Sequence, residues 1–448
     1  MADHSWSTSA NPTYRVLIIG CGLAGLAAAI GIRRVGHEVT ILEKAAELQE
    51  LGAGINVSPN GTLIFREWGI LDAIKDKANI PYAASMRSYK DSFQLFSQPL
   101  GRQMEELYSA PYLVIHRADL HSVLVQEADR LEIAIHLDSH FTRINFSDPS
   151  VELSNGKTYD ADIILGADGE RSACRDALLG YNIPSQDSGD HVFRITVKAS
   201  DVAQHKDLME LVQPPCVNLW VGPGANAITY ALKRDGLLNV VLTCAHDISK
   251  TIQHGPRRVE IHEAREAFGK WDDKFQTLLS LAQGCTKWTL LQTPEALYWT
   301  HPDGKFALLG DSAHAMLPYL GQGAAVAFED AAVLGTLFSK VQHKSQLPDI
   351  LSIYERLRKP RTTALRSRSQ AMRDVYAFDD GPLQQERDRQ LQHHAPFDGF
   401  PNFLADPVLQ KSMFSYNAID EAEKAWDTYL RGEWPSTRGM WNVVSREA

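Results

Sequence analysis

The stretch that decides the fold is RVLIIGCGLAGLAAAIGIRRVGHEVTILEKA, residues 15–45. Its first six residues form an apolar run that ends in glycine, which is typical of a buried parallel strand. An alanine-rich segment with a helical pattern follows up to Gly36, and HEVTILEKA predicts a second buried strand that ends at Glu43. A strand, a tight turn, a helix and a strand within about 30 residues predict a βαβ unit and a doubly wound α/β sheet.

The turn in this unit reads Gly20-x-Gly22-x-x-Gly25. The first glycine permits the tight turn, the second lets the backbone approach a pyrophosphate, and the third lets the helix pack closely on the strand. Glu43 lies 23 residues after Gly20, where a carboxylate accepts hydrogen bonds from a ribose. We therefore predict dinucleotide binding; the alternative is a glycine-rich structural turn.

Length and composition set the wider frame. A chain of 448 residues holds two or three domains at about 150 residues each. Apolar residues make up 44% and charged residues 22%, which excludes disordered, collagen-like and coiled-coil chains. The 45 basic and 55 acidic residues give a net charge of −10, so we expect no nucleic-acid partner and no anionic membrane surface.

The cysteines and the N-terminus indicate a cytoplasmic location. Five cysteines without a CxxC pattern are expected to be core residues in a reducing compartment, and no metal site is predicted. The first 14 residues have neither a basic region nor an apolar region of a secretory signal. Since no charge-poor apolar run reaches about 18 residues, no membrane span is expected.

Beyond this unit the pattern changes along the chain. Residues 45–130 are mixed and mostly helical, with a glycine- and proline-marked loop at 52–61 before a helix near 61–68. Residues 141–169 predict short strands, with Asn155-Gly156 as a type I′ hairpin turn. Residues 190–245 alternate in strand fashion and predict an antiparallel block.

The parallel sheet is expected to resume after that block. KFALLGD, residues 305–311, predicts a buried strand, and a small-residue helix is expected over 322–338. The last 75 residues predict helices and loops on the outside. A second glycine pattern, Gly222-Pro-Gly224-x-x-Ala227, precedes a strand rather than a helix, so we interpret it as a hairpin turn.

Two further motifs end predicted strands. One is Asp168-Gly169-x-x-Ser172-x-x-Arg175, although a strand-end Asp-Gly is usually only a turn. The other is Gly310-Asp311-Ser312-Ala313-His314. Its Asp, Ser and His invite a hydrolase interpretation, which fails because no G-x-S-x-G elbow exists and three neighbouring residues cannot converge as a triad. An acid at this edge of the sheet is suited to a sugar or polyol hydroxyl.

In order and spacing, the three motifs resemble those of the group A flavoprotein aromatic monooxygenases over residues 14–370. LPYLGQGAAVAFEDAAVLG, residues 317–335, is similar to the salicylate hydroxylase subgroup. The resemblance implies non-covalent FAD and NAD(P)H as a visiting cosubstrate, which agrees with the single fingerprint. It also implies an FAD-binding domain from 14–180 and 296–375, a substrate domain over 181–295, and a helical region over 376–448.

Family position implies a set of cofactor contacts. Glu43 would bind the adenosine ribose, Arg117 the phosphates or the flavin edge, and Asp311 the ribityl chain. Asp168 and Arg175 belong to a motif that serves FAD and NAD(P)H in the family. The other implied contacts are Gly20, Gly22, Gly25, Asn56, Gly321, Gly323 and Ala324. Small residues let backbone N–H groups approach the flavin, and the helix dipole stabilises its anionic reduced form.

The resemblance also implies the chemistry, in which reduced flavin captures O2 as a C4a-hydroperoxide that an electron-rich ring attacks. Arg194 and Tyr230 match catalytic positions of natural-product tailoring members, where they would hold or protonate an oxygen of the substrate. Alternatively, Arg194 is paired or solvent-facing, and Tyr230 merely packs. We expect His314 to be structural and Tyr319 to form a pocket wall.

Several substrate classes are compatible with the sequence. The predicted substrate domain has no clear anchor for a salicylate carboxylate, so a phenol, a resorcinol or an indole oxidised across its 2,3-bond fits as well as salicylate. In the indole case, Arg194 would assist opening of the epoxide. A two-electron oxidase or dehydrogenase is the rival enzyme, and a nucleotide-binding recognition protein is the rival outside catalysis.

Overall fold

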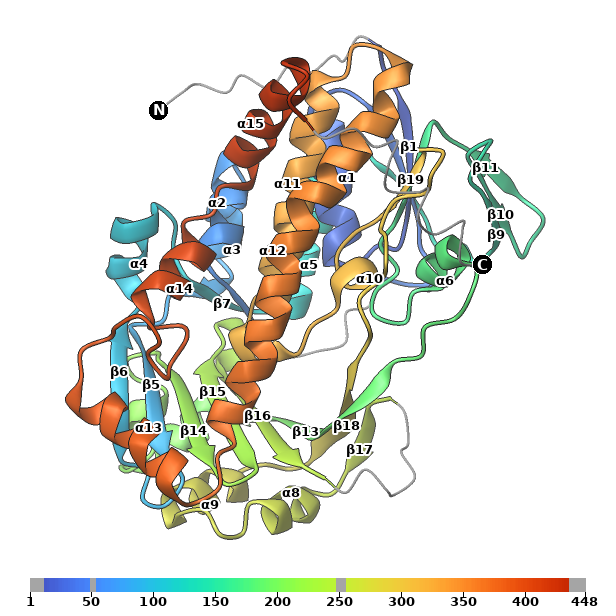
Figure 1. Cartoon of the computed structure of the whole chain (residues 1–448). Coiled ribbons are helices and arrows are strands. Elements are labelled where there is room, and N and C mark those ends of the chain that lie inside the picture. Colours follow the sequence, from blue (N-terminus) through green and yellow to red (C-terminus); the bar gives the residue numbers. More distant parts are fainter. Residues whose placement is uncertain (1–11, 49–53, 247–254, 435–448) are drawn as a thin grey trace.

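The protein is described by a computed structural model over residues 12–48, 54–246 and 255–434. Gly52 of the predicted loop, the N-terminal segment searched for a signal, and the final residues of the predicted C-terminal region lie outside these ranges. A parallel sheet and a larger sheet occupy opposite ends of the molecule, and long helices run between them (Figure 1).

The parallel sheet has the strand order β19-β12-β1-β2-β8. Its strands are β1 (Arg15–Ile19), β2 (Glu38–Leu42), β8 (Ala134–His136), β12 (Ile163–Gly166) and β19 (Phe306–Leu308). Helix α1 (Leu23–Arg34) connects β1 to β2, which pair in parallel, so the predicted βαβ unit is confirmed. β19 pairs with β12 although 139 residues separate Gly166 from Phe306, which confirms that the chain re-enters the sheet.

The larger sheet has eight strands in the order β17-β18-β13-β16-β15-β14-β5-β6. The predicted block supplies β13 (Gln186–Lys198), β14 (Val217–Gly222), β15 (Ala225–Ala231), β16 (Leu237–Ala245), β17 (Arg257–Val259) and β18 (Cys285–Gln292). β5 (Ala83–Ser88) and β6 (Gln94–Pro99) were not predicted as strands of this sheet. The β5–β14 pair is parallel and the others are antiparallel, so the mainly antiparallel prediction is confirmed.

The two faces of the large sheet have different surroundings. Its outer face packs Phe193, Trp220 and other apolar side chains against α8 (Ile261–Ala267) and α9 (Asp273–Ser280). The inner face points toward the long helices and the parallel sheet (Figure 1). The second glycine pattern lies at the β14–β15 hairpin, where Gly222 opposes Ala225, so the hairpin interpretation is confirmed.

Two small sheets complete the strands. β9 (Phe141–Asn145), β10 (Ser150–Leu153) and β11 (Thr158–Asp160) form one, and β3 (Gly54–Val57), β7 (Leu113–His116) and β4 (Ala78–Asn79) form the other. The type I′ prediction at Asn155-Gly156 is wrong, because only Gly156 has a positive φ, +82°. The Gly156 N–H donates to the Leu153 carbonyl, as in a type I turn followed by a glycine bulge.

Helices connect the two ends of the molecule. Helix α12 (Leu347–Tyr376) has 30 residues, so it is about 45 Å long and reaches the large sheet (Figure 1). The predicted C-terminal helical region is confirmed by α13 (Pro382–His393), α14 (Pro407–Phe414) and α15 (Ala418–Leu430). The other α-helices are α2 (Pro59–Glu67), α3 (Leu71–Lys75), α4 (Gly101–Tyr108), α5 (Arg117–Arg130), α6 (Ala173–Leu179), α7 (Ala199–Ala203), α10 (Asp311–His314) and α11 (Gly323–Lys340).

The burial of the cysteines and the character of the helices test two further expectations. Cys21, Cys174 and Cys285 are buried as predicted, whereas Cys216 and Cys244 are only half-buried, and all five are free thiols. None of the helices in the described ranges combines the length and the apolar character that crossing a membrane requires.

Candidate functional site

A cavity of about 690 Å³ lies between the loops of the parallel sheet and the large sheet. One half is lined by the starts of α1 and α11, by β3 and by the loops after β12 and β19. The other half is lined by the inner face of the large sheet, chiefly β13 to β16 and β18. We call these halves the cofactor end and the substrate end. A concave site of this size with few polar groups is typical of small-molecule binding.

The glycine turn at the cofactor end leaves no room for a side chain at its first and third glycines. Gly20 has a φ of +109°, and a Cβ there would lie 2.4 Å from the Ala167 carbonyl oxygen. A Cβ at Gly25 would lie 2.0 Å from the Gly20 oxygen. Gly22 instead lines the cavity, and a Cβ there would have no atom within 4 Å. The uncapped first turn of α1 has no acidic residue, so its N–H groups form a cradle suited to a pyrophosphate.

Glu43 follows β2 and lies beside this turn. Its Oε2 accepts from the Cys21 N–H at 2.8 Å, and its Oε1 accepts from the Ala45 N–H at 2.8 Å. The carboxylate is therefore held next to the cradle with acceptor capacity left. Of the predicted site residues, Gly20, Gly25, Glu43 and Asp168 do not line the cavity, whereas Gly22, Asn56, Arg117, Arg194, Tyr230, Asp311, Gly321, Gly323 and Ala324 do.

Asp168 organises the chain after β12. Its carboxylate accepts from the Ser172 hydroxyl and from the Cys174 N–H. The Ser172 oxygen in turn caps α6 by accepting from the Arg175 N–H at 2.8 Å. Arg175 is buried and donates to the Glu170 carbonyl at 2.9 Å and to the Ser312 carbonyl at 3.4 Å. Through Arg175, this motif hydrogen-bonds the segment after β12 to the loop after β19.

Asp311, Ser312 and His314 in the loop after β19 do not form a catalytic triad. The Ser312 hydroxyl donates to the Gly166 carbonyl at 2.6 Å, and His314 Nε2 lies 2.6 Å from Asp330 Oδ2. His314 is fully buried and structural, as expected. Asp311, the first residue of α10, lines the cavity. Glu170, which the sequence analysis did not single out, also lines it, and burial together with the Asp311 carboxylate raises the pKa of Glu170.

A fully buried ionic network supports this loop from behind. Arg358 bonds Glu329 Oε2 at 2.7 Å through Nη1 and Asp330 Oδ1 at 2.8 Å through Nε, and all three side chains have 0% exposure. Asp330 Oδ2 also accepts from the Gly310 N–H at 3.0 Å. Burial opposes their ionisation, but the cations keep the pKa of both carboxyls below its ordinary value. Two adjacent acids inside an apolar helix were the sequence signal for this network.

The start of α11 forms the second backbone surface of the cofactor end. The first turn has no acidic residue and no side-chain cap, and a Cβ at Gly323 would have no atom within 4 Å. Gly321 precedes it with a φ of +60° and lies beside Asn56. The Asn56 Oδ1 is buried and finds no hydrogen-bond partner within the described ranges. Open backbone N–H groups and an unsatisfied amide oxygen fit the polar edge of a flavin.

Arg194 and Tyr230 lie on the inner face of the large sheet. The Arg194 guanidinium lies 4.9 Å from the Trp288 ring, and its Nε has no hydrogen-bond partner among the described residues. Burial lowers the pKa of Arg194, but an arginine remains a cation at neutral pH. Tyr230 is 4% exposed, and burial raises its pKa. It contacts β3 at Gly54, where a Cβ would lie 2.1 Å from the Tyr230 ring.

Tyr319 forms a wall of the cavity, as expected, and is held there by a buried ion pair. Its hydroxyl donates to Asp190 Oδ2 at 2.6 Å. Arg373 of α12 bonds both carboxylate oxygens of Asp190, with Nη2 to Oδ1 at 2.7 Å. This pair could not be predicted from local sequence patterns because β13 and α12 are far apart along the chain.

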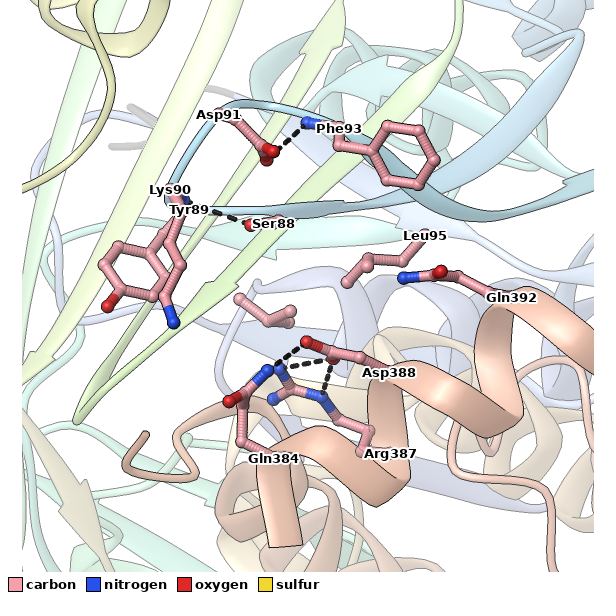
Figure 2. A pocket seen from close by; sticks show the side chains of 11 residues that line it. Ser88, Tyr89, Lys90, Asp91, Phe93, Leu95, Gln384, Arg387, Asp388 and Gln392 are labelled. Carbon is pink, nitrogen blue, oxygen red and sulfur yellow. Dashed lines mark hydrogen bonds and ion pairs between the residues drawn. The ribbon is translucent and has the colours of Figure 1, made fainter. Parts of the chain in front are cut away.

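A second cavity, of about 130 Å³, lies between the β5–β6 hairpin and α13 (Figure 2). Its polar groups are bonded to one another: Asp388 accepts from Arg387 and Gln384, and Asp91 accepts from the Phe93 N–H. These bonds stay within α13 and within the hairpin, and they supply no feature of a cofactor site.

The fold and the larger cavity define a dinucleotide-binding protein of the doubly wound class with an adjoining substrate compartment. The chain belongs to the family described as FAD binding domain, whose model matches residues 13–369.

Individual relatives agree with this membership. The FAD-dependent monooxygenase OpS4 of Beauveria bassiana (strain ARSEF 2860) is 35% identical over 415 residues, which cover 92% of this chain and 96% of the relative. The 3-amino-4-hydroxybenzoate 2-monooxygenase PtnB3 of Streptomyces platensis is 32% identical over 399 residues, covering 88% and 97%. A salicylate hydroxylase substrate complex has the same fold, with a TM-score of 0.77, 22% identity, and 96% and 100% of the two chains covered.

The chain is thus an FAD-dependent monooxygenase, and NAD(P)H is the cosubstrate typical of this family. The resemblance drawn from the three motifs is confirmed, and the non-catalytic alternative is excluded. The cofactor end fits FAD on its own geometry, because two uncapped helix starts and glycines without neighbours border one cavity.

Proposed function

We propose that this monooxygenase adds one oxygen atom of O2 to an electron-rich aromatic ring held against the inner face of the large sheet. The observation that carries the proposal is the continuity of one cavity from Gly22 and Gly323 to Arg194 and Tyr230. A ring in the substrate end would lie next to the group bound in the cofactor end, with both arginine and tyrosine donors beside it.

In this proposal, the cofactor end holds FAD mainly through backbone. Gly22 and the start of α1 would bind the pyrophosphate, Glu43 the ribose of the adenosine, and Asp311 the ribityl chain. The remaining contacts would come from Asn56, Arg117, Gly321, Gly323 and Ala324, while Gly20, Gly25, Asp168 and Arg175 shape the surrounding turns. When FAD is bound and reduced by NAD(P)H, it supplies the activated oxygen.

Arg194 is the residue proposed to control charge at the substrate. Its Nε is buried and unpartnered, so it can donate to a phenolic oxygen of the ring. A phenolate held by a guanidinium is more electron-rich than the phenol, and the same donor stabilises charge that develops on oxygen. The Tyr230 hydroxyl would add a second donor, and the apolar floor around both excludes water.

Ring hydroxylation of a phenol or resorcinol is favoured over epoxidation of an indole. The printed name of PtnB3 describes a monooxygenase that acts on a benzoate with amino and hydroxyl substituents. An electron-rich ring with an oxygen substituent also gives the unpartnered Arg194 donor an acceptor.

The test uses FAD-loaded enzyme with a panel of phenols, resorcinols and indoles, each with NADH and with NADPH. We expect a substrate to stimulate NAD(P)H oxidation and to gain one ¹⁸O atom from ¹⁸O2. Stimulated oxidation that yields only hydrogen peroxide, with no labelled product from any ring class, would contradict the proposal.

A further inference from the structure

One row of residues across the inner face of the large sheet carries a pair of polar side chains, Asn226 and Thr243. Strand register places Asn226 of β15 opposite Thr243 of β16, and Thr243 opposite Val192 of β13. Val192 in turn opposes Trp288 of β18, and Asn226 opposes Val221 of β14. This row therefore consists of Asn226 and Thr243 between apolar neighbours.

Both polar side chains are buried and face the cavity. Asn226 is 6% exposed and Thr243 is 5% exposed, and both line the substrate end. Neither side chain forms a hydrogen bond within the part of the chain that the structure describes, and both open onto the cavity. Buried amides and hydroxyls are almost always hydrogen-bonded in folded proteins. The polar groups of this pair are therefore available to a molecule bound in the cavity.

Strand spacing sets the distance between this pair and Arg194. Arg194 lies in the next row, opposite Val241, with Ile228 beyond it. Strands lie about 4.8 Å apart and rows about 6.8 Å apart. Measured across the sheet between Cα positions, Thr243 therefore lies roughly 8 Å and Asn226 roughly 12 Å from Arg194. One benzene ring is too short to bridge this distance, whereas two fused rings span it.

The charges around the pair favour an uncharged ligand group. The cations that line the cavity within the described ranges are Arg117, Arg171 and Arg194. The cation of Arg373 is already bonded to both carboxylate oxygens of Asp190, which lies two residues before Val192 on β13. A carboxylate at Asn226 and Thr243 would have no counter-ion, and its desolvation would oppose binding.

We propose that the substrate is an aromatic molecule of two-ring length that carries a neutral hydrogen-bonding group, such as an amide, bound by Asn226 and Thr243. Its ring oxygen binds at Arg194 at the other end. This assignment rests on the proposed function, since it takes the substrate end as the place of the reacting ring. Asn226 and Thr243 are then specificity-determining residues.

Two probes of equal shape test the proposal: 6-hydroxy-2-naphthamide and 6-hydroxy-2-naphthoate. Each is titrated into FAD-loaded enzyme, and the dissociation constant is read from the change in the visible absorbance of the bound flavin, which requires no turnover. We expect the amide to bind at least tenfold more tightly than the carboxylate. Incorporation of ¹⁸O is measured separately on the same probes.

Isosteric variants locate the effect. Thr243→Val and Asn226→Leu should each weaken amide binding about five- to tenfold, as expected for one lost hydrogen bond, and should change carboxylate binding less. Thr229→Val is the matched control, because Thr229 lies on β15, is 0% exposed, and belongs to the outer face of the sheet. It should leave both affinities unchanged.

The outcomes separate this inference from the proposed function. Equal affinities for the two probes, no amide binding at millimolar concentration, or an equal effect of Thr243→Val and Thr229→Val would overturn the inference. Tight, Thr243-dependent amide binding without ¹⁸O incorporation from any ring would support the subsite and contradict the proposed function instead.

Discussion

The two ends of the cavity are built in different ways. The cofactor end consists of backbone: two uncapped helix starts and glycines whose added Cβ would meet nothing or would meet a carbonyl oxygen. The substrate end consists mainly of side chains on neighbouring strands of the large sheet. The first design suits FAD, the cofactor for which the family is described, whereas the second can change its ligand by single substitutions.

The support behind each end also differs. Behind the loop after β19 lies the ionic network of Arg358, Glu329 and Asp330, which is fully buried. Behind the floor of the substrate end lies an apolar cluster with α8 and α9. Rigidity at the cofactor end therefore depends on paired charges, and at the substrate end on packing. Four predictions test this contrast, from the largest expected effect to the smallest.

Removing the central cation should have the largest effect. Arg358→Met leaves Glu329 and Asp330 buried with less compensation, which should lower the free energy of unfolding by about 3–5 kcal/mol in urea titrations. Arg389→Met is the control, since the Arg389–Glu386 ion pair is exposed and should contribute nothing measurable. Equal stability of the two variants would show that the network does not support the cofactor end.

A side chain in the phosphate cradle should remove FAD without unfolding the protein. Gly22 has extended backbone, with φ −75° and ψ −176°, so Gly22→Val is tolerated locally but fills the cradle. We expect FAD affinity to fall by at least about 100-fold, the order of a few lost charge-assisted hydrogen bonds, with the melting temperature of apoprotein unchanged. Gly25→Val should lower that melting temperature as well, because its Cβ would collide with the Gly20 oxygen. Unchanged FAD affinity in Gly22→Val would place the pyrophosphate elsewhere.

Loss of Arg194 should affect turnover and leave the cofactor bound. Arg194→Ala should lower kcat about 100-fold, the usual cost of one preorganised donor to a developing oxyanion, and should raise hydrogen peroxide release. Arg194→Lys should recover part of the rate. FAD affinity, measured by flavin fluorescence, is the internal control and should not change. A variant with normal coupled turnover would assign Arg194 a packing role on Trp288.

The smallest effect concerns the pH dependence of a histidine pair, one on β13 and one just after β16. Burial lowers the pKa of His191 to about 4, and His246, stacked at 3.8 Å, acts in the same direction. The unfolded chain has a histidine pKa near 6.5, so it takes up the proton first as pH falls. Stability should therefore decrease between about pH 6.5 and 4 and level off below, by about 1 kcal/mol after allowance for solvent screening. His191→Gln should flatten this part of a urea-stability profile; an unchanged slope would assign it to other groups.

Local signals predicted the cofactor end well. The β1–α1–β2 unit, the turn at Gly20 to Gly25 and the helix start near Gly323 depend on residues that are neighbours in sequence. Their roles follow from backbone sterics, which the residue types state directly. The same reasoning separated the hairpin at Gly222 from a true dinucleotide turn.

The substrate end could be predicted only in outline. Strands β13 to β16 show their alternation, but β5 pairs with β14 from more than 100 residues away, and β6 pairs with β5. Which residues face the cavity depends on register, and a shift of one residue would turn Asn226 and Thr243 to the other face. The partner of Glu329 and Asp330 likewise lies on another helix.

The sequence by itself determined the class of this protein, because the glycine turn, the two strand-end motifs and the alternating block are local patterns with local physical causes. The tertiary structure decided which side chains meet. It brought Arg194, Tyr230, Asn226 and Thr243 to one cavity wall and placed Arg358 between two buried acids. These contacts depend on strand register and helix packing between distant segments, which residue patterns along one chain do not encode.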